Sequence, residues 1–163
     1  MRQSREPGYG SPYRDYARHM GRLQATAQVD WAGMRGSVHG GSGALQAPTS
    51  TQAELGGPGV GTNPEELLAA AHANCFTSTL TSLARRRELP LDRIETAVTY
   101  ELVWEDGRGD HHLASSRIRV RVDSDAPWGD VERLVRAAEE ECPVCRAIAG
   151  NVAMVVELEP IAS

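Results

Sequence analysis

The chain has 163 residues, a formal net charge of −5 and a hydrophobic fraction of 40%. That length suits one domain with a real core, and the acidic balance argues against a protein that binds nucleic acid through a basic face. The sequence contains no apolar run long enough to cross a bilayer, and its N-terminus lacks the apolar stretch of a secretory signal. We therefore expect a cytoplasmic protein with no membrane partner.

Two regions of different composition are predicted. Residues 1–20 are rich in Arg, Tyr, Gly, Pro and Ser and show no periodicity, which is typical of a disordered extension. Residues 21–163 are expected to form a single domain. The boundary lies beside Met20, which would then be an alternative start of the folded chain.

The first part of the domain is predicted to be extended and the next part helical. Residues 25–31 favour a strand, the glycine-broken segment 33–45 favours a hairpin or two short strands, and 47–62 has the composition of a loop. A helix is predicted from Pro64 to about 87, with Thr62 or Asn63 as its N-cap. Its apolar residues cover most of the circumference, which predicts a buried helix.

The remaining elements complete an α+β pattern. Residues 94–105 and 116–122 alternate as half-buried antiparallel strands do, with a glycine-containing turn between them. An amphipathic helix is predicted over 127–141, a second helix from about 142 to 150, and a last strand over 151–160. Helices segregated from antiparallel sheets define the α+β class.

Three cysteines are too few for a disulfide scaffold, and in a reducing compartment such cysteines are buried, catalytic or metal-binding. Cys75 lies in the apolar helix and has a simple alternative role as a small core residue. Cys142 precedes Pro143 where a helix begins, a position that favours a thiolate. Glu65 has the alternative role of complementing the positive end of its helix.

The C-x-x-C pair formed by Cys142 and Cys145 raises two further hypotheses. A thioredoxin-like redox pair would need a βαβ context, which the sequence does not provide. Half of a zinc site would need a second ligand pair, and Cys75, His111 and His112 do not provide one at metal spacing. We therefore expect no metal and no other cofactor.

The motifs GTNPEELLAAAHANCF (61–76) and ECPVCRAIAGNV (141–152) resemble the osmotically inducible protein C / organic hydroperoxide resistance (OsmC/Ohr) family, and more closely its OsmC branch. The resemblance covers roughly residues 22–160. It implies antiparallel sheets packed on a central buried helix in an intertwined homodimer, with two active sites at the subunit interface.

The resemblance also implies a cysteine-based peroxidase that reduces organic hydroperoxides and, less well, hydrogen peroxide, in the defence against oxidative and osmotic stress. Cys75 matches the attacking cysteine, Cys142 the resolving cysteine and Glu65 the glutamate that holds an arginine. Arg35, in the first hairpin, is the candidate for that arginine. A small dithiol or a lipoyl- or thioredoxin-type protein would be the reductant.

One departure from the family is Cys145, where serine is usual. We expect it to be an auxiliary thiol that displaces Cys75 from the Cys75–Cys142 disulfide and leaves a Cys142–Cys145 disulfide nearer the surface for the reductant, with a small buried residue in place of serine as the alternative. A low-activity stress or small-ligand-binding protein on the same fold remains the main alternative function. A redox-sensing regulator would need a DNA-binding module, which the sequence does not show.

Overall fold

The computed structural model describes residues 22–104 and 111–161. The predicted disordered extension and most of the turn predicted after residue 105 lie outside these residues. The elements are β1 (Ala27–Ala32), β2 (Arg35–Gly40), β3 (Gln46–Ser50), a 3₁₀ turn (Ala53–Leu55), α1 (Pro64–Arg86), β4 (Arg93–Trp104), β5 (His111–Asp123), α2 (Trp128–Glu141), α3 (Pro143–Ile148) and β6 (Ala153–Pro160).

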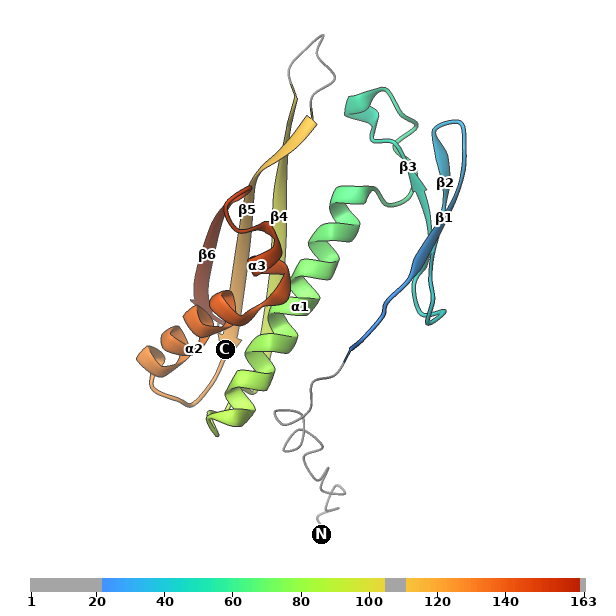
Figure 1. Cartoon of the computed structure of the whole chain (residues 1–163). Helices are drawn as coiled ribbons and strands as arrows, with labels where there is room; N and C mark the ends of the chain where they lie inside the picture. The colour runs from blue at the N-terminus through green and yellow to red at the C-terminus, as the bar shows by residue number, and fades with distance from the viewer. Residues whose placement is uncertain (1–21, 105–110, 162–163) are drawn as a thin grey trace, which may run out of the picture.

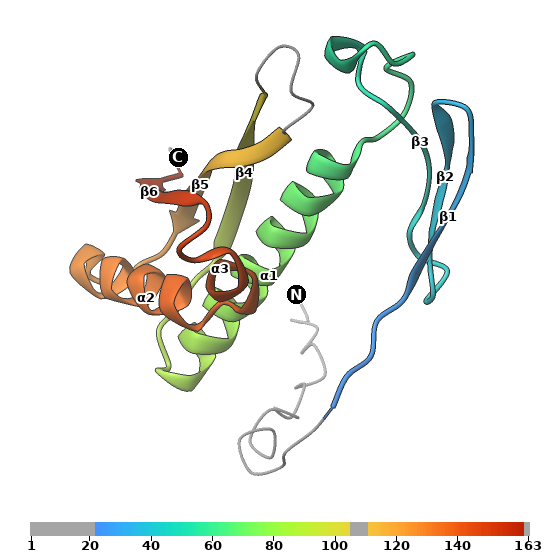
Figure 2. The same cartoon turned by 45° about the horizontal axis from the view of Figure 1, so that its top comes forward.

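The strands form two separate three-stranded sheets, in the orders β1-β2-β3 and β4-β5-β6. Helices α1, α2 and α3 cover one face of the second sheet, whereas the first sheet stands apart on the other side of α1 (Figures 1 and 2). Within the described residues, no strand of the first sheet packs extensively against the helices or the second sheet. The mixed arrangement confirms the predicted α+β class.

The core lies between the second sheet and the three helices. Alternation along β5 buries Ser116, Ile118, Val120 and Val122 and turns the intervening arginines to the other face. The rest of the buried apolar cluster comes from the helices: Phe76, Leu80, Leu83, Ala84, Val131, Leu134, Val135, Ala138, Cys142 and Cys145. Two of the three cysteines are therefore part of this core.

One pairing differs from the predicted antiparallel sheets, because β6 runs parallel to β5, with Ser115 opposite Ala153 and Val122 opposite Pro160. The chain leaves β5, passes through α2 and α3 and returns beside it. A helical crossover of this kind joins parallel strands, whereas a tight turn joins antiparallel ones. The crossover thus places the α2–α3 junction over the sheet.

The predicted loop 47–62 begins as a strand. Residues 46–50 pair with β2, and the buried Thr49 and Ser50 hold the following loop. Thr49 Oγ1 donates to the carbonyl of Thr62 over 3.1 Å, and the Val60 N–H donates to Ser50 Oγ over 2.8 Å. Loop-like composition therefore missed a strand that depends on pairing with its neighbour.

Helix α1 begins where the capping pattern predicts. The Asn63 side chain accepts a hydrogen bond from the Glu66 N–H over 2.8 Å, and Pro64 occupies the first position of the helix. Just before it, Gly61 has φ +86, and a side chain there would meet the Pro48 carbonyl oxygen at 2.5 Å. This close turn connects the first sheet to α1.

Among the helices of the described residues, none is long and apolar enough to span a membrane.

Within one chain, α1 is buried along one side rather than around its circumference. The buried residues on it are His72, Phe76, Leu80, Leu83 and Ala84. Ala70 and Ala71 are exposed, and Leu67 and Leu68 are only half-buried. These four residues form an apolar flank of α1, which the sequence predicted to be buried and which needs another surface to cover it. We expect that surface to be a second copy of the chain.

The first prediction concerns this flank. Sedimentation at low micromolar concentration should show a homodimer, because covering an apolar helix flank stabilises association. Ala71→Glu places a charge on the flank and should yield smaller species or a lower melting temperature. A wild-type monomer under these conditions would contradict the expectation.

Candidate functional site

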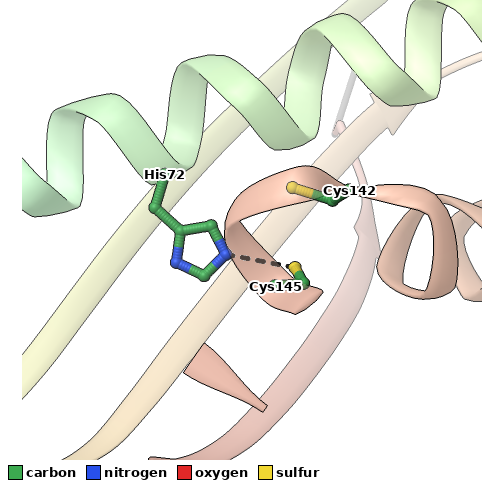
Figure 3. A group of neighbouring side chains, drawn as sticks. All are labelled: His72, Cys142 and Cys145. Atoms are coloured by element: carbon green, nitrogen blue, oxygen red, sulfur yellow. Dashed lines mark hydrogen bonds between the residues drawn. The ribbon is translucent and has the colours of Figure 1, made fainter. Parts of the chain in front are cut away.

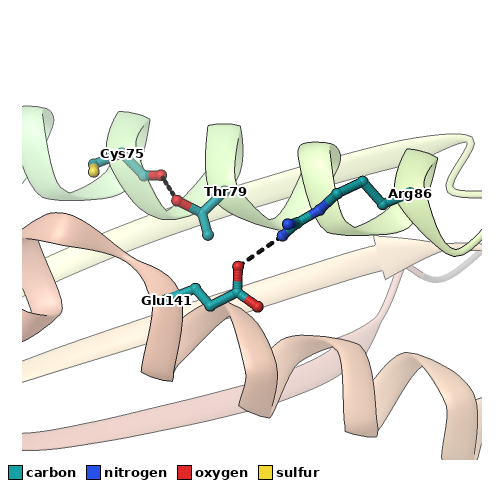
Figure 4. Close-up of polar contacts among 4 residues, drawn as sticks. All are labelled: Cys75, Thr79, Arg86 and Glu141. Carbon is teal, nitrogen blue, oxygen red and sulfur yellow. Dashed lines mark hydrogen bonds and ion pairs between the residues drawn. The ribbon is translucent and has the colours of Figure 1, made fainter. Parts of the chain in front are cut away.

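Cys75 lies halfway along α1, on the turn that faces α3. Its side chain is half-buried and lies close enough to the Cys142 side chain and the Val144 backbone for both to affect its pKa. One turn further along, Thr79 Oγ1 donates to the Cys75 carbonyl over 2.9 Å (Figure 4). The predicted pair of cysteines is thus brought together by α1 and the α2–α3 junction.

Cys142 is the residue at which α2 ends and α3 begins. Its φ of −62° and ψ of 119° are extended, as expected for a residue before proline. Its N–H donates to the Ala138 carbonyl over 2.8 Å, and its carbonyl accepts from the Arg146 N–H over 3.0 Å. Because both backbone groups are paired, the thiol can be fully buried without an unsatisfied backbone.

An ion pair ties this junction to α1 from outside. Arg86 Nη2 lies 2.6 Å from Oε2 of Glu141, the residue before Cys142 (Figure 4). Both side chains are about half exposed, so the pair contributes at most about 1 kcal/mol. It aligns the end of α2 with α1, while the apolar core supplies most of the packing energy.

His72 and Cys145 form a second buried contact beside the first. His72 Nε2 lies 3.1 Å from Cys145 Sγ, and His72 Nδ1 lies 2.7 Å from the Tyr100 hydroxyl (Figure 3). Burial lowers the pKa of His72, so its imidazole is neutral and has one donor and one acceptor nitrogen. The sequence analysis overlooked His72. Its position three residues before Cys75, on the same helix face, was the available signal.

Burial dominates the electrostatics of the thiols. It raises the pKa of Cys75, a hydrogen bond from the Val144 backbone lowers it in part, and the Cys142 side chain raises it again. Burial and the neighbouring Cys142 raise the pKa of Cys145 to about 12. Cys145 therefore keeps its proton at neutral pH, and the direction of its hydrogen bond with His72 Nε2 depends on the tautomer of His72. The tautomer with a proton on Nδ1 donates to the Tyr100 oxygen and leaves Nε2 as the acceptor from Cys145, and the other tautomer reverses both bonds.

The structure does not join Glu65 to Arg35 within one chain. Glu65 Oε2 accepts a hydrogen bond from Gln52 Nε2 over 2.7 Å. Arg35 is exposed at the start of β2, opposite Ser50, and in the described part of the chain it forms no ion pair with Glu65. The predicted partnership of Arg35 and Glu65 is therefore not formed within the described part of one chain.

Comparisons with known proteins find relatives of this sequence and of this fold. The profile of a family described as OsmC-like protein matches residues 56–157. YmaD of Bacillus subtilis is 32% identical over 136 residues, covering 80% of this chain and 89% of YmaD. The organic hydroperoxide resistance protein OhrB of Bacillus subtilis is 34% identical over 100 residues, covering 61% of this chain and 71% of OhrB. The crystal structure of the organic hydroperoxide resistance protein OsmC from Legionella pneumophila matches with a TM-score of 0.75 and 28% identity, over 85% of this chain and 98% of that one.

The second prediction concerns the accessibility of the thiols. Iodoacetamide should modify Cys75 first in the reduced, folded protein, because Cys142 and Cys145 are 0% and 1% exposed. Peptide mapping after alkylation measures the order, and denatured protein is the control in which all three react. Equal labelling of the three cysteines in the folded protein would mean that the buried pair opens readily.

Proposed function

The chain belongs to the OsmC-like protein family, and on this premise we propose that it is a thiol peroxidase that reduces organic hydroperoxides. The observation that carries the proposal is the proximity of Cys75 and Cys142, two thiols that lie 67 residues apart in sequence, one on α1 and the other at the α2–α3 junction. Relatives named organic hydroperoxide resistance proteins support the substrate class.

The proposed cycle uses these two thiols in turn. The Cys75 thiolate attacks the peroxide O–O bond, the alkoxide leaves and takes up a proton, and Cys75 becomes a sulfenic acid. The Cys142 thiol then attacks that sulfur, water leaves and a Cys75–Cys142 disulfide forms. A dithiol, either small or carried on a lipoyl- or thioredoxin-type protein, reduces the disulfide by exchange. We place this cycle in the cytoplasm, where such reductants are kept reduced.

The different exposures of the two thiols suit these roles. Cys75 is partly exposed and can meet a substrate, whereas Cys142 is fully buried beside Cys75. The apolar surroundings of the pair favour an organic peroxide, since its hydrocarbon part gains from leaving water. The sulfenic acid forms next to its partner thiol, which limits further oxidation.

The main requirement of the cycle is a thiolate at Cys75. Burial raises the pKa of this thiol in the single chain, so a nearby cation would be needed to lower it. We propose that Arg35 supplies this cation within the homodimer. The first sheet, which carries Arg35, stands away from its own chain's core and is free to lie against a second copy (Figure 2). Glu65, near the start of α1, would orient the guanidinium.

A low-activity stress or ligand-binding protein on the same fold is the second candidate. The observation in its favour is that Glu65 is bound by the neutral amide of Gln52 rather than by an arginine. Without a cation, Cys75 would remain protonated and react slowly. A peroxide-consumption assay with saturating dithiol distinguishes the candidates, because only the peroxidase turns over many equivalents.

The third prediction tests the two roles directly. Cys75→Ser should lower turnover of cumene hydroperoxide by at least about 10³-fold, because it removes the nucleophile. Cys142→Ser should complete one oxidation and then stop, with Cys75 trapped as a sulfenic acid or oxidised further. Intact mass after peroxide treatment separates these products. Full activity in Cys75→Ser would show that Cys75 only packs in the core, and it would refute the mechanism.

The fourth prediction tests the cation. Arg35→Met should move the pH dependence of Cys75 alkylation to higher pH, because losing a cation raises the pKa of a thiol. Arg117→Met is the matched control, since Arg117 lies on the outer face of the second sheet, where it pairs with Glu157. Identical profiles for the Arg35 variant and wild type would leave the thiolate to another cation or to none.

A further inference from the structure

Three buried side chains converge at the contact between α1 and α3. The ligand atoms of His72, Cys142 and Cys145 all lie within 4.8 Å of one another, and the three residues are 0 to 1% exposed (Figure 3). The proposed peroxidase cycle uses only one of them, Cys142. His72 and Cys145 are left as a hydrogen-bonded pair in the core without a catalytic task.

The spacing of these atoms fits a tetrahedral metal ion. Bond lengths of about 2.3 Å to sulfur and 2.0–2.1 Å to nitrogen place the donor atoms about 3.5–3.8 Å apart. His72 Nε2 and Cys145 Sγ are 3.1 Å apart without an ion, so small side-chain movements suffice. Two thiolates and an imidazole suit Zn²⁺, whereas Ca²⁺ and Mg²⁺ prefer oxygen ligands.

The histidine is already oriented as a ligand would be. The Tyr100 hydroxyl lies 2.7 Å from Nδ1 and thereby directs Nε2 toward the two sulfur atoms. Metal-bound histidines commonly use their second ring nitrogen in such a hydrogen bond, which selects the tautomer and the ring orientation. Tyr100 lies on β4, so a third element of the fold supports the site.

We propose that His72, Cys142 and Cys145 form a binding site for one Zn²⁺ ion per chain. Binding releases two protons from the two thiols and involves no change of oxidation state, so no electron donor is needed. The proton now shared by Cys145 and His72 is one of the two that leave.

Occupancy of this site would regulate the peroxidase, a consequence that rests on the proposed function. A Cys142 thiolate bound to zinc is held away from the Cys75 sulfenic acid and cannot form the disulfide. Zinc would therefore stop turnover after one oxidation. The bound zinc would also protect Cys142 and Cys145 from oxidation.

The test uses full-length protein, reduced and freed of metal by a chelator. Titration with Co²⁺ should give thiolate-to-cobalt charge-transfer bands and the intense visible bands of a tetrahedral site, saturating at one ion per chain. Zn²⁺ should then displace the cobalt. Tyr100→Phe should bind Co²⁺ about 10–100-fold more weakly, because the orienting hydrogen bond is lost.

Substitutions of the ligands decide the assignment. Cys145→Ser changes little volume and should abolish the charge-transfer bands, as should His72→Gln, while His112→Gln on the exposed part of β5 should keep them. Circular dichroism checks that each variant is folded. Wild-type protein without tetrahedral cobalt bands, or a folded Cys145→Ser variant that keeps them, would overturn the proposal.

One further variant separates this site from the peroxidase. Cys75→Ser should lose peroxide reduction yet keep the cobalt bands of wild type, since Cys75 is not a ligand. Conversely, Zn²⁺ should inhibit turnover of wild type but not of Cys145→Ser, each compared with its own metal-free rate. Inhibition that persists unchanged in Cys145→Ser would contradict the regulatory role.

Discussion

The packing of the α2–α3 junction against α1 is the contact on which the candidate site depends. Pro143 cannot continue α2, so the chain bends at Cys142 and starts α3 in a new direction. That bend leaves Cys142 inside the core, beside Cys75 of α1. Removing apolar contacts from this region would cost about 2–5 kcal/mol per large side chain, so the core also sets the precision of the site.

Burial creates both the opportunity and the difficulty of this chemistry. It places Cys142, Cys145 and a neutral imidazole in the core and Cys75 at its edge, and the raised pKa values of Cys75 and Cys145 oppose formation of the reactive thiolate. A nearby positive charge opposes this effect. The two proposals supply it differently: an arginine from the first sheet would serve Cys75, and a metal ion would serve Cys142 and Cys145. Cys142 belongs to both, which is why the two states exclude one another.

Local signals in the sequence were sufficient for most of the elements. Asn63 and Pro64 placed the start of α1 correctly, and the alternation of β5 identified its buried face. The parallel pairing of β6 was missed, because strand direction depends on the path of the crossover rather than on any residue. β3 was missed because its polar residues become a strand only by pairing with β2.

The site residues could be predicted only in part from the sequence, for similar reasons. Cys75 and Cys142 could be named from their motifs, but His72 sits among alanines and looks like a helix residue until α3 is packed against it. The predicted role of Cys145 as a thiol that brings the disulfide nearer the surface finds no support in its burial. The link between Arg35 and Glu65 depends on how two copies meet, which one chain does not determine.

The central claim is that Cys75 and Cys142 form a disulfide as the product of peroxide reduction. Reduced, metal-free protein treated with one equivalent of cumene hydroperoxide and then digested without reductant measures this directly. The account predicts a chain that is two hydrogens lighter and a cross-linked peptide pair containing Cys75 and Cys142, with Cys145 still a free thiol. A disulfide confined to Cys142 and Cys145, or no disulfide at all, would contradict it.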